Sequence, residues 1–193
     1  MTNTDAVASL TLARQEPGVE SSGRSSRAGD PPYERVFLVG APRSGTTWLA
    51  KIFDAHPRTL YRHEPDSVCF THEFPPFLEA EQAAPYLPAA RAYVDLLFGV
   101  RNIKTAGARP WFEKSYRSRA GELYRRGILS AISTTERVPG CHRWARRLAV
   151  PDIVDRPATA DVLPVAKSVV AGGRVGLFAR ACPEMQLVAI VRH

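Results

Sequence analysis

The chain has 193 residues, of which 45% are hydrophobic, and a formal net charge of +7. This length supports one core of ordinary size, in which roughly 70% of the unfolded chain's surface is buried, and the hydrophobic content is that of a globular protein. No run of about 20 apolar residues occurs, so no membrane span is predicted. Three widely spaced cysteines argue against a disulfide framework and favour a reducing compartment, the cytoplasm.

The positive charge is carried mostly by arginine, and eight arginines lie between Arg117 and Arg147. Such a run can form a surface for an anionic substrate, a membrane or nucleic acid. It can also form a solvated helical face, which is the usual role of a charge run and the interpretation we favour. No aromatic interleaving or nucleic-acid motif accompanies the run, so no nucleic-acid partner is predicted.

The first elements can be placed by composition and apolar pattern. Residues 1–32 are rich in Ser, Gly, Thr and charge, which predicts a disordered lead-in to one α/β domain at 33–193. The apolar run Val36–Val39 predicts a buried strand. A tight turn follows, and a helix is expected to open at Thr46 and to end before Pro57.

The later elements are predicted by their apolar spacing and by the breakers between them. They are strands at 58–61, 163–170 and 187–191 and helices at 89–100, 115–131 and 173–181. Strands that alternate with helices predict an α/β fold, with a P-loop-like parallel sheet and helices on both faces. A parallel strand normally leads into a covering helix. A chain that stops directly after a strand therefore suggests a fold that is incomplete at its C-terminal end, as in a piece of a longer protein.

The turn between the first strand and the first helix has the composition of an anion-binding loop. Backbone N–H groups at a helix start have no internal partner, and the helix dipole adds positive charge there. Arg43 adds a fixed cation to the loop. Hydroxyl donors come from Ser44, Thr46 and Thr47.

The glycine spacing refines this prediction. Gly40 and Gly45 are separated by four residues, as in the nucleotide-binding P-loop G-x-x-x-x-G-K-[ST]. Thr47 occupies the Ser/Thr position, but Thr46 stands where the P-loop has lysine. Because that lysine normally reaches the β- and γ-phosphates, the loop is predicted to bind an anion without hydrolysing ATP. A P-loop nucleotide kinase, which would need Mg²⁺ on its phosphates, stays as an alternative.

The string Pro42-Arg-Ser-Gly-Thr-Thr-Trp-Leu49 resembles the 5′-phosphosulfate loop of the sulfotransferase family, which holds the donor 3′-phosphoadenosine 5′-phosphosulfate. The resemblance covers about residues 35–193. Near the chain end, Met185–His193 resembles the strand that opens the family's 3′-phosphate motif. The residues that the resemblance implies for donor binding are Arg43, Ser44, Gly45, Thr46, Thr47, Trp48 and Arg192.

The resemblance also implies the catalytic cations. Val165-Ala-Lys-Ser168 resembles the family's strand that carries a lysine near the sulfuryl group. Lys167 and Arg43 are therefore expected to stabilise the charge that develops during transfer. From the residues alone, Lys167 lies near a predicted strand end, where open α/β sheets bind ligands.

The general base is expected at Glu64. Many cytosolic relatives have a histidine just after the lysine-bearing strand, whereas this chain has Ser168 and Val169 there. Carbohydrate-type relatives carry a glutamate, commonly followed by proline, after the second strand, and Glu64-Pro65 fits that pattern. A carboxylate can serve as a base when partial burial raises its pKa toward working pH. The reserve candidates are His63 and His72.

The implied function is transfer of a sulfuryl group from 3′-phosphoadenosine 5′-phosphosulfate to a hydroxyl of a small molecule or carbohydrate. No metal is predicted, because the Cys69/His72 and Cys141/His142 pairs do not complete a tetrahedral ligand set. The non-enzyme alternative is a catalytically inactive nucleotide- or anion-binding fragment. No pattern in the sequence identifies the acceptor or the oligomeric state.

Overall fold

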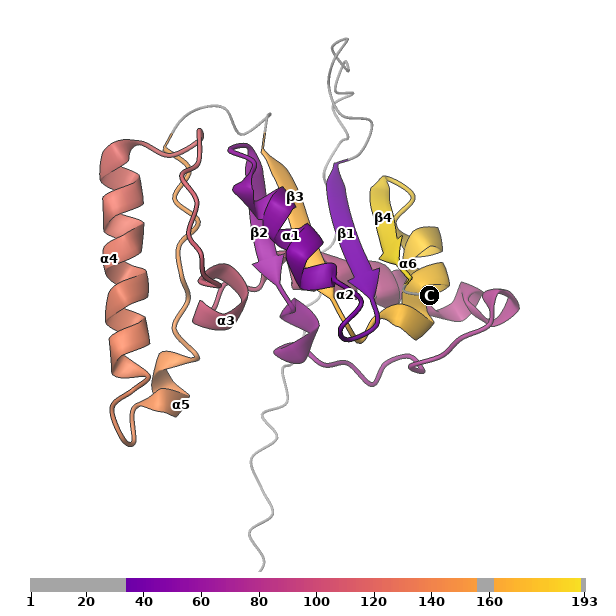
Figure 1. The fold of residues 1–193 in the computed structure, drawn as a ribbon. Coiled ribbons are helices and arrows are strands. Elements are labelled where there is room, and N and C mark those ends of the chain that lie inside the picture. Colours follow the sequence, from indigo (N-terminus) through magenta and orange to yellow (C-terminus); the bar gives the residue numbers. More distant parts are fainter. Residues whose placement is uncertain (1–33, 156–161, 192–193) are drawn as a thin grey trace, which may run out of the picture. The chain divides into compact units, whose positions relative to one another are not determined.

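The computed structural model describes residues 34–155 and 162–191 of the chain (Figure 1). The predicted lead-in at 1–32 and the predicted donor ligand Arg192 lie outside the described residues.

Four strands form one sheet in which every neighbouring pair is parallel. They are β1 (Arg35–Gly40), β2 (Thr59–His63), β3 (Leu163–Ser168) and β4 (Met185–Ile190), in the spatial order β2-β3-β1-β4. The predicted parallel sheet is confirmed. Each strand was located correctly, and its ends differ from the predicted ends by two residues or fewer.

The helices surround this sheet. The α-helices are α1 (Thr46–Ala55), α2 (Leu87–Gly99), α3 (Ile103–Ala106), α4 (Arg119–Thr135), α5 (His142–Ala145) and α6 (Val175–Ala181). Short 3₁₀ turns are η1 (Pro65–Ser67), η2 (Ala80–Gln82), η3 (Ala84–Tyr86) and η5 (Gly172–Arg174). Three of the predicted helices correspond to α2, α4 and α6. The four-residue helices α3 and α5 were not predicted, because one turn is too short to show a helical period.

Strand β1 is buried on both faces, which explains its unbroken apolar run. Val36 and Leu38 pack with Ala50 of α1 on one face of the sheet. Phe37 lies on the other face, where the aromatic ring of Phe178 from α6 meets it edge-on at 5.9 Å. Helix α2 packs on the same face as α6. Helices therefore cover both faces, as predicted (Figure 1).

Helices α3, α4 and α5 lie beside β2, away from the other strands (Figure 1). They share a small core of their own, formed by Ile103, Ala106, Leu129, Ile132, Ala145 and Val150. Helix α4 begins where the Ser118 hydroxyl accepts a hydrogen bond from the N–H of Gly121 at 3.0 Å, a typical N-cap. Within the described residues, no helix has the length and apolar character needed to cross a membrane.

Because all four strands run in the same direction, their carboxyl ends meet at one edge of the sheet. Gly40, His63 and Ser168 are the last residues of β1, β2 and β3 at this edge. The loop before α1 and the residues after β2 leave the sheet here, so the sequence motifs that are far apart in the chain converge where open α/β sheets bind ligands.

Candidate active site

The loop between β1 and α1 is shaped by close packing at Gly40. A β-carbon at this position would lie 2.6 Å from Thr46 Cγ2 and 2.9 Å from the carbonyl oxygen of Ile190. Real β-carbons do not approach other atoms this closely, so only glycine fits where the loop, the helix start and β4 meet. The side chain of Thr46 fills that space and is 2% exposed.

The next part of the loop has an unusual backbone. Gly45 precedes α1 with φ 93°, and Arg43 has φ 66°, which places both residues in the left-handed region. The N–H of Ser44 donates to the carbonyl of Ala41 at 3.1 Å and closes the turn. These conformations leave the first N–H groups of α1 without intrahelical acceptors at the exposed side of the loop.

The loop also presents side chains that suit an anion. Arg43 and Thr47 are exposed, and open space surrounds the position that a β-carbon on Gly45 would take. The hydroxyl of Ser44 is buried and has no hydrogen-bond partner within the described residues. A buried polar atom without a partner is costly, so an acceptor oxygen supplied by a bound phosphate or sulfate would satisfy this hydroxyl.

Lys167 connects this loop to the neighbouring strand. It lies on β3 opposite Leu38 of β1 and His63 of β2, and its side chain is 1% exposed. The ammonium Nζ lies 3.1 Å from Thr47 Oγ1 and 2.5 Å from Glu64 Oε1. A lysine is almost never buried unless it is paired, and here its partners are the loop hydroxyl and the carboxylate that the sequence motifs indicated.

The backbone of Glu64 fixes its side chain beside Lys167. The Glu64 N–H donates to the carbonyl of Lys167 at 2.9 Å. Glu64 has φ 44° and ψ 55°, although it precedes Pro65, and a residue before proline prefers an extended backbone. A left-handed residue with a side chain costs about 1–2 kcal/mol. Such strain is found mainly where a site requires it.

The pKa of Glu64 differs from the sequence-based expectation. Burial by itself raises the pKa of this carboxyl, as expected, but the hydrogen bond and the charge of Lys167 lower it by more. The pKa therefore lies below its ordinary value, and the expectation of a raised pKa is wrong for the arrangement in which Lys167 contacts Glu64. Glu64 is a carboxylate at neutral pH, the form that a base needs, but its basicity is reduced.

His63 lies on the other side of Glu64. Its Nδ1 is 2.9 Å from the hydroxyl of Tyr61, and its Nε2 is 4.0 Å from Glu64 Oε1. Burial lowers the pKa of His63, and the charge of Lys167 lowers it further. The imidazole is therefore neutral at neutral pH. Tyr61 was not predicted as part of the site, although two polar rings at i and i+2 on one strand share a face.

Two further polar residues lie close to the site and were not predicted. Asp66, 4% exposed, accepts a hydrogen bond from the hydroxyl of Ser168. Burial raises the pKa of Asp66, and the charge of Glu64 raises it further. Lys104 of α3 contributes a positive charge that lowers the pKa of both His63 and Glu64. No sequence signal indicated Lys104, because α3 is brought beside β2 only by the tertiary fold.

The remaining candidates lie elsewhere. The ring of His72 is exposed and contacts Phe70 at 4.8 Å between ring centres. Trp48, on the first turn of α1, is 72% exposed. In the part of the chain that the structure describes, no three His, Cys, Asp or Glu side chains are grouped closely enough to hold a metal ion.

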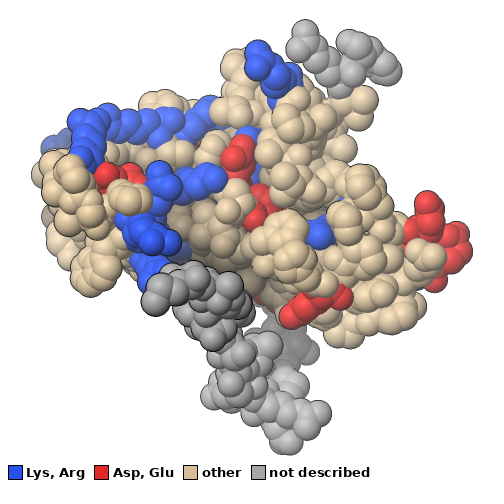
Figure 2. Space-filling view, turned by 90° about the horizontal axis from the view of Figure 1, so that it is seen from below, with Lys and Arg blue, Asp and Glu red and all other residues tan. Residues whose placement is uncertain are grey.

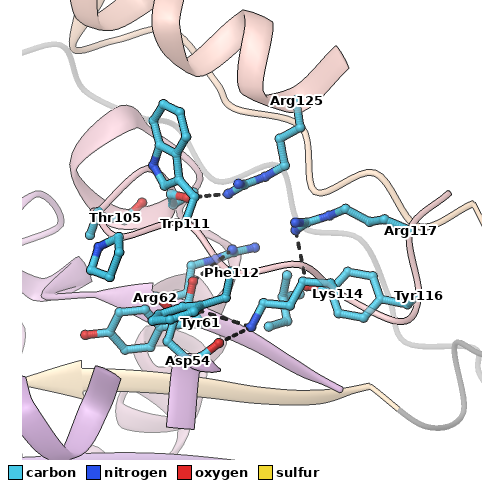
Figure 3. A pocket seen from close by; sticks show the side chains of 14 residues that line it. Asp54, Tyr61, Arg62, Thr105, Trp111, Phe112, Lys114, Tyr116, Arg117 and Arg125 are labelled. Atoms are coloured by element: carbon cyan, nitrogen blue, oxygen red, sulfur yellow. Dashed lines mark hydrogen bonds and ion pairs between the residues drawn. The ribbon is translucent and has the colours of Figure 1, made fainter. Parts of the chain in front are cut away.

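A second polar region lies behind β2, where two arginines of the charge run are buried (Figure 3). Arg117 pairs with Glu122 at 3.1 Å, and Arg125 donates to the carbonyl of Ala106. Burial, followed by the charge of Arg117, lowers the pKa of Arg125 to about 10. The cavity at their centre measures about 20 Å³, room for a single water molecule, so this region is no substrate pocket.

The same region attaches the helical segment to the sheet. Figure 3 shows Lys114 and Asp54 turned toward each other, with their charged atoms 3.3 Å apart. Arg62 of β2 binds both carboxylate oxygens of Asp152 at 2.8 and 2.7 Å. These pairs join segments that are distant in the sequence. The prediction that the arginine run forms a solvated helical face is therefore wrong for Arg117 and Arg125, because both side chains are buried.

The fold thus brings the β1–α1 loop, Lys167 and Glu64 together at the carboxyl edge of a parallel sheet. Residues 35–193 match the model of the sulfotransferase family, so the chain belongs to this family. No curated protein and no solved structure matches the chain significantly. Membership confirms the resemblance read from the loop, and sulfuryl transfer is the chemistry of the family.

Proposed function

We propose that this sulfotransferase takes the sulfuryl group from 3′-phosphoadenosine 5′-phosphosulfate and transfers it to a hydroxyl of a small molecule or carbohydrate. The observation that carries the proposal is the position of Lys167. Its ammonium contacts Thr47 of the anion-binding loop and Glu64 at once, so a cation, a loop for the donor and a carboxylate meet at one point.

The donor would be held by the loop and by the start of α1. Arg43 and Thr47 are exposed and free to contact its 5′-phosphosulfate. The buried hydroxyl of Ser44 gains an acceptor there. Gly45 and Thr46 would contribute their backbone N–H groups, since the Thr46 side chain is buried against Gly40. The exposed ring of Trp48, and Arg192 beyond the described residues, complete the proposed set.

Once bound, the donor supplies a sulfuryl group joined to a phosphate oxygen that leaves with the electron pair. Lys167 and Arg43 stabilise the negative charge that grows at this end of the site. Glu64 accepts the proton of the acceptor hydroxyl. Lys167 cannot hold Glu64 and neutralise the leaving oxygen equally well, so its movement away from Glu64 would strengthen the base when the anion is in place.

The kinase alternative has less support. The loop lacks the lysine that reaches the terminal phosphates of ATP, and Thr46, which stands in its place, is buried. Lys167 supplies a cation from a different strand, which suits a sulfuryl group whose oxygens need no Mg²⁺. The three cysteines are free thiols, which supports a reducing compartment, the cytoplasm, as part of the proposal.

The proposal is tested by incubating the protein with the sulfur-labelled donor and a panel of phenols, alcohols and sugars, with EDTA present. Labelled sulfate ester in at least one reaction supports it. ATP with Mg²⁺ should release no phosphate, and rapid release would favour a kinase. Tight binding of adenosine 3′,5′-bisphosphate without any turnover would instead identify an inactive nucleotide-binding module.

A further inference from the structure

A large groove opens beside the carboxyl end of β2. It has a volume of about 830 Å³ and lies between η1 and the helices α3, α4 and α5. Ser67 and Val68, which follow Glu64 closely in the chain, form one wall. A volume of this size is typical of a site for a small ligand, and it exceeds by far the cavity behind β2.

The walls of the groove are strongly basic. Its charged lining residues are Lys104, Arg109, Arg143, Arg146, Arg147 and a single acid, Glu136. Glu136 is engaged by Arg146 at 3.2 Å. Lys104, Arg143 and Arg147 are exposed, and among the described residues none of these three has an ion-pair partner. Figure 2, viewed toward the carboxyl ends of the strands, shows Lys and Arg side chains gathered over the α4 and α5 side.

Cations that face one groove repel each other, and this repulsion raises the free energy of the folded protein. The same cations spread over a convex, solvated face would repel each other less. The other arginines of the run show the contrast, because Arg117 and Arg125 are buried with their own acceptors. A cleft lined by one sign of charge concentrates ions of the opposite sign. The unpaired cations of the groove therefore indicate an anionic ligand.

One wall of the groove follows the proposed base closely in the chain. The Ser67 hydroxyl donates to the backbone carbonyl of Glu64 at 2.6 Å, so a wall residue of the groove is hydrogen-bonded to the backbone of the proposed base. The charge of Lys104, which lines the groove, also acts on Glu64 and His63. An acceptor whose hydroxyl lies at the Ser67 wall, which follows Glu64 in the chain, would extend toward the arginines of the opposite wall.

We propose that the acceptor is an acidic molecule, whose carboxylate, phosphate or sulfate group binds Lys104, Arg143 and Arg147 while its hydroxyl meets Glu64. This inference rests on the proposed function. In the step itself the hydroxyl proton passes to Glu64 and the acceptor oxygen forms a bond to sulfur. The bond from sulfur to the donor's phosphate oxygen breaks, and that oxygen keeps the electron pair.

The test uses pairs of acceptors that differ in one charge. An aromatic pair is 4-hydroxyphenylacetate and 2-(4-hydroxyphenyl)ethanol, and a sugar pair is galacturonate and galactose. In at least one pair the acidic member should have a KM about tenfold or more below that of its neutral partner, and the responding pair distinguishes an aromatic from a sugar acceptor. Arg143→Ala/Arg147→Ala should abolish this preference, with kcat changed by less than about twofold.

The control is Arg119→Ala/Arg137→Ala, which removes two exposed arginines of the same run that do not line the groove. It should keep the preference for the acidic acceptor. Equal KM values for both members of each pair in the parent protein would overturn the inference. An equal loss in the control would also overturn it, because the effect would then come from net charge alone.

A binding measurement separates this inference from the proposed function. Trp111 lines the groove, so its fluorescence can follow binding of the four acceptors to protein saturated with adenosine 3′,5′-bisphosphate. Acidic acceptors should bind more tightly than neutral ones, and the difference should vanish in Arg143→Ala/Arg147→Ala. If acidic acceptors bind more tightly but no sulfate ester forms, the proposed sulfuryl transfer is wrong, while the inference that the groove binds an acidic ligand is supported. If no acidic acceptor binds, the inference is wrong even when transfer occurs.

Discussion

Lys167 Nζ and Glu64 Oε1 lie 2.5 Å apart, with Lys167 on β3 and Glu64 directly after the end of the neighbouring strand β2. The pair keeps Glu64 ionised and makes its basicity depend on the position of one lysine. The same lysine also contacts Thr47 in the loop. In the proposed mechanism an anion bound at the loop competes with Glu64 for Lys167, and this competition links donor binding to activation of the base.

The base can be tested by Glu64→Gln. This change removes the proton acceptor and keeps the size of the side chain, so turnover should fall by roughly 10²–10⁴. The affinity for adenosine 3′,5′-bisphosphate, measured by calorimetry, should change little. Full activity in Glu64→Gln would move the base to His63, whose neutral imidazole lies beside Glu64.

The pKa of Glu64 should rise when Lys167 is replaced by methionine. Lys167 is the main cause that lowers this pKa, so its removal leaves burial, which raises the pKa, opposed only by the weaker charges of His63 and Lys104. Carboxyl-carbon NMR of labelled protein measures the titration without any need for activity. Lys104→Met should give a smaller rise, because the charge of Lys104 contributes less. An unchanged titration in Lys167→Met would show that the pair does not control Glu64.

Donor binding at the loop is tested by Arg43→Ala and Thr47→Ala. Each should weaken binding of adenosine 3′,5′-bisphosphate by about 1.5–3 kcal/mol, the value of a charge-assisted hydrogen bond. Arg58→Ala is the control, because Arg58 is exposed and precedes β2 at the opposite edge of the sheet. Unchanged affinity for adenosine 3′,5′-bisphosphate in both loop variants would contradict donor binding at this loop.

The packing at Gly40 predicts opposite effects at two glycines. Gly40→Ala places a β-carbon within 3 Å of Thr46, Ser44 and Ile190 atoms, so it should lower the midpoint of thermal unfolding and weaken nucleotide binding. Gly127→Ala in the middle of α4 meets no atom within 4 Å and should stabilise the protein by about 0.5–1 kcal/mol. A stable Gly40→Ala protein with normal nucleotide affinity would contradict the close approach.

The buried pair of Arg117 and Glu122 predicts a pH-dependent loss of stability. Burial raises the pKa of Glu122, but hydrogen bonds from Arg117 and Arg126 lower it by more. Glu122→Gln should cost about 2 kcal/mol at pH 7. Because the folded pKa is lowered, this contribution is complete above the ordinary value of about 4.3 and is lost as the pH falls through the folded pKa.

Denaturant titrations of the parent protein and of Glu122→Gln from pH 7 to pH 3 measure this difference. It should stay constant down to about pH 5 and shrink at lower pH. Glu113→Gln serves as the control, since the Glu113 side chain is 88% exposed and its replacement should stay within about 0.5 kcal/mol of the parent. If the difference in unfolding free energy between the parent and Glu122→Gln grew as the pH fell, the pKa of Glu122 would be raised in the folded protein, which contradicts the prediction.

The sequence predicted the sheet well because a parallel strand buried on both faces leaves an unbroken apolar run, as in Val36–Val39. The contact of Lys167 with Glu64 was not predicted, because the register of the sheet decides which residues of neighbouring strands meet. A periodic apolar pattern shows which side chains of a strand share one face of the sheet, but it does not show which residues of the neighbouring strand lie opposite them. Lys167 lies opposite His63, and this pairing brings Glu64 next to Lys167.

The pKa of Glu64 was mispredicted for the same reason. Partial burial was anticipated, but the compensating charge comes from another strand and from Lys104 of α3, a one-turn helix without a periodic signal. The Asn102–Thr105 capping box, in which each side chain bonds the other's backbone N–H, was the one local signal for α3. The arginine run was divided by tertiary packing that composition does not encode, with Arg117 and Arg125 inside and Arg143 and Arg147 at the groove.

The small core shared by α3, α4 and α5 has a consequence for how this enzyme can change. The donor loop depends on packing around the sheet, whereas the basic wall of the groove is carried by helices that bury their own apolar residues. Substitutions at well-separated sites without shared partners usually add independently. With the proposed roles, acceptor preference could change through exposed wall residues such as Arg143 and Arg147 without any change in the residues proposed to hold the donor.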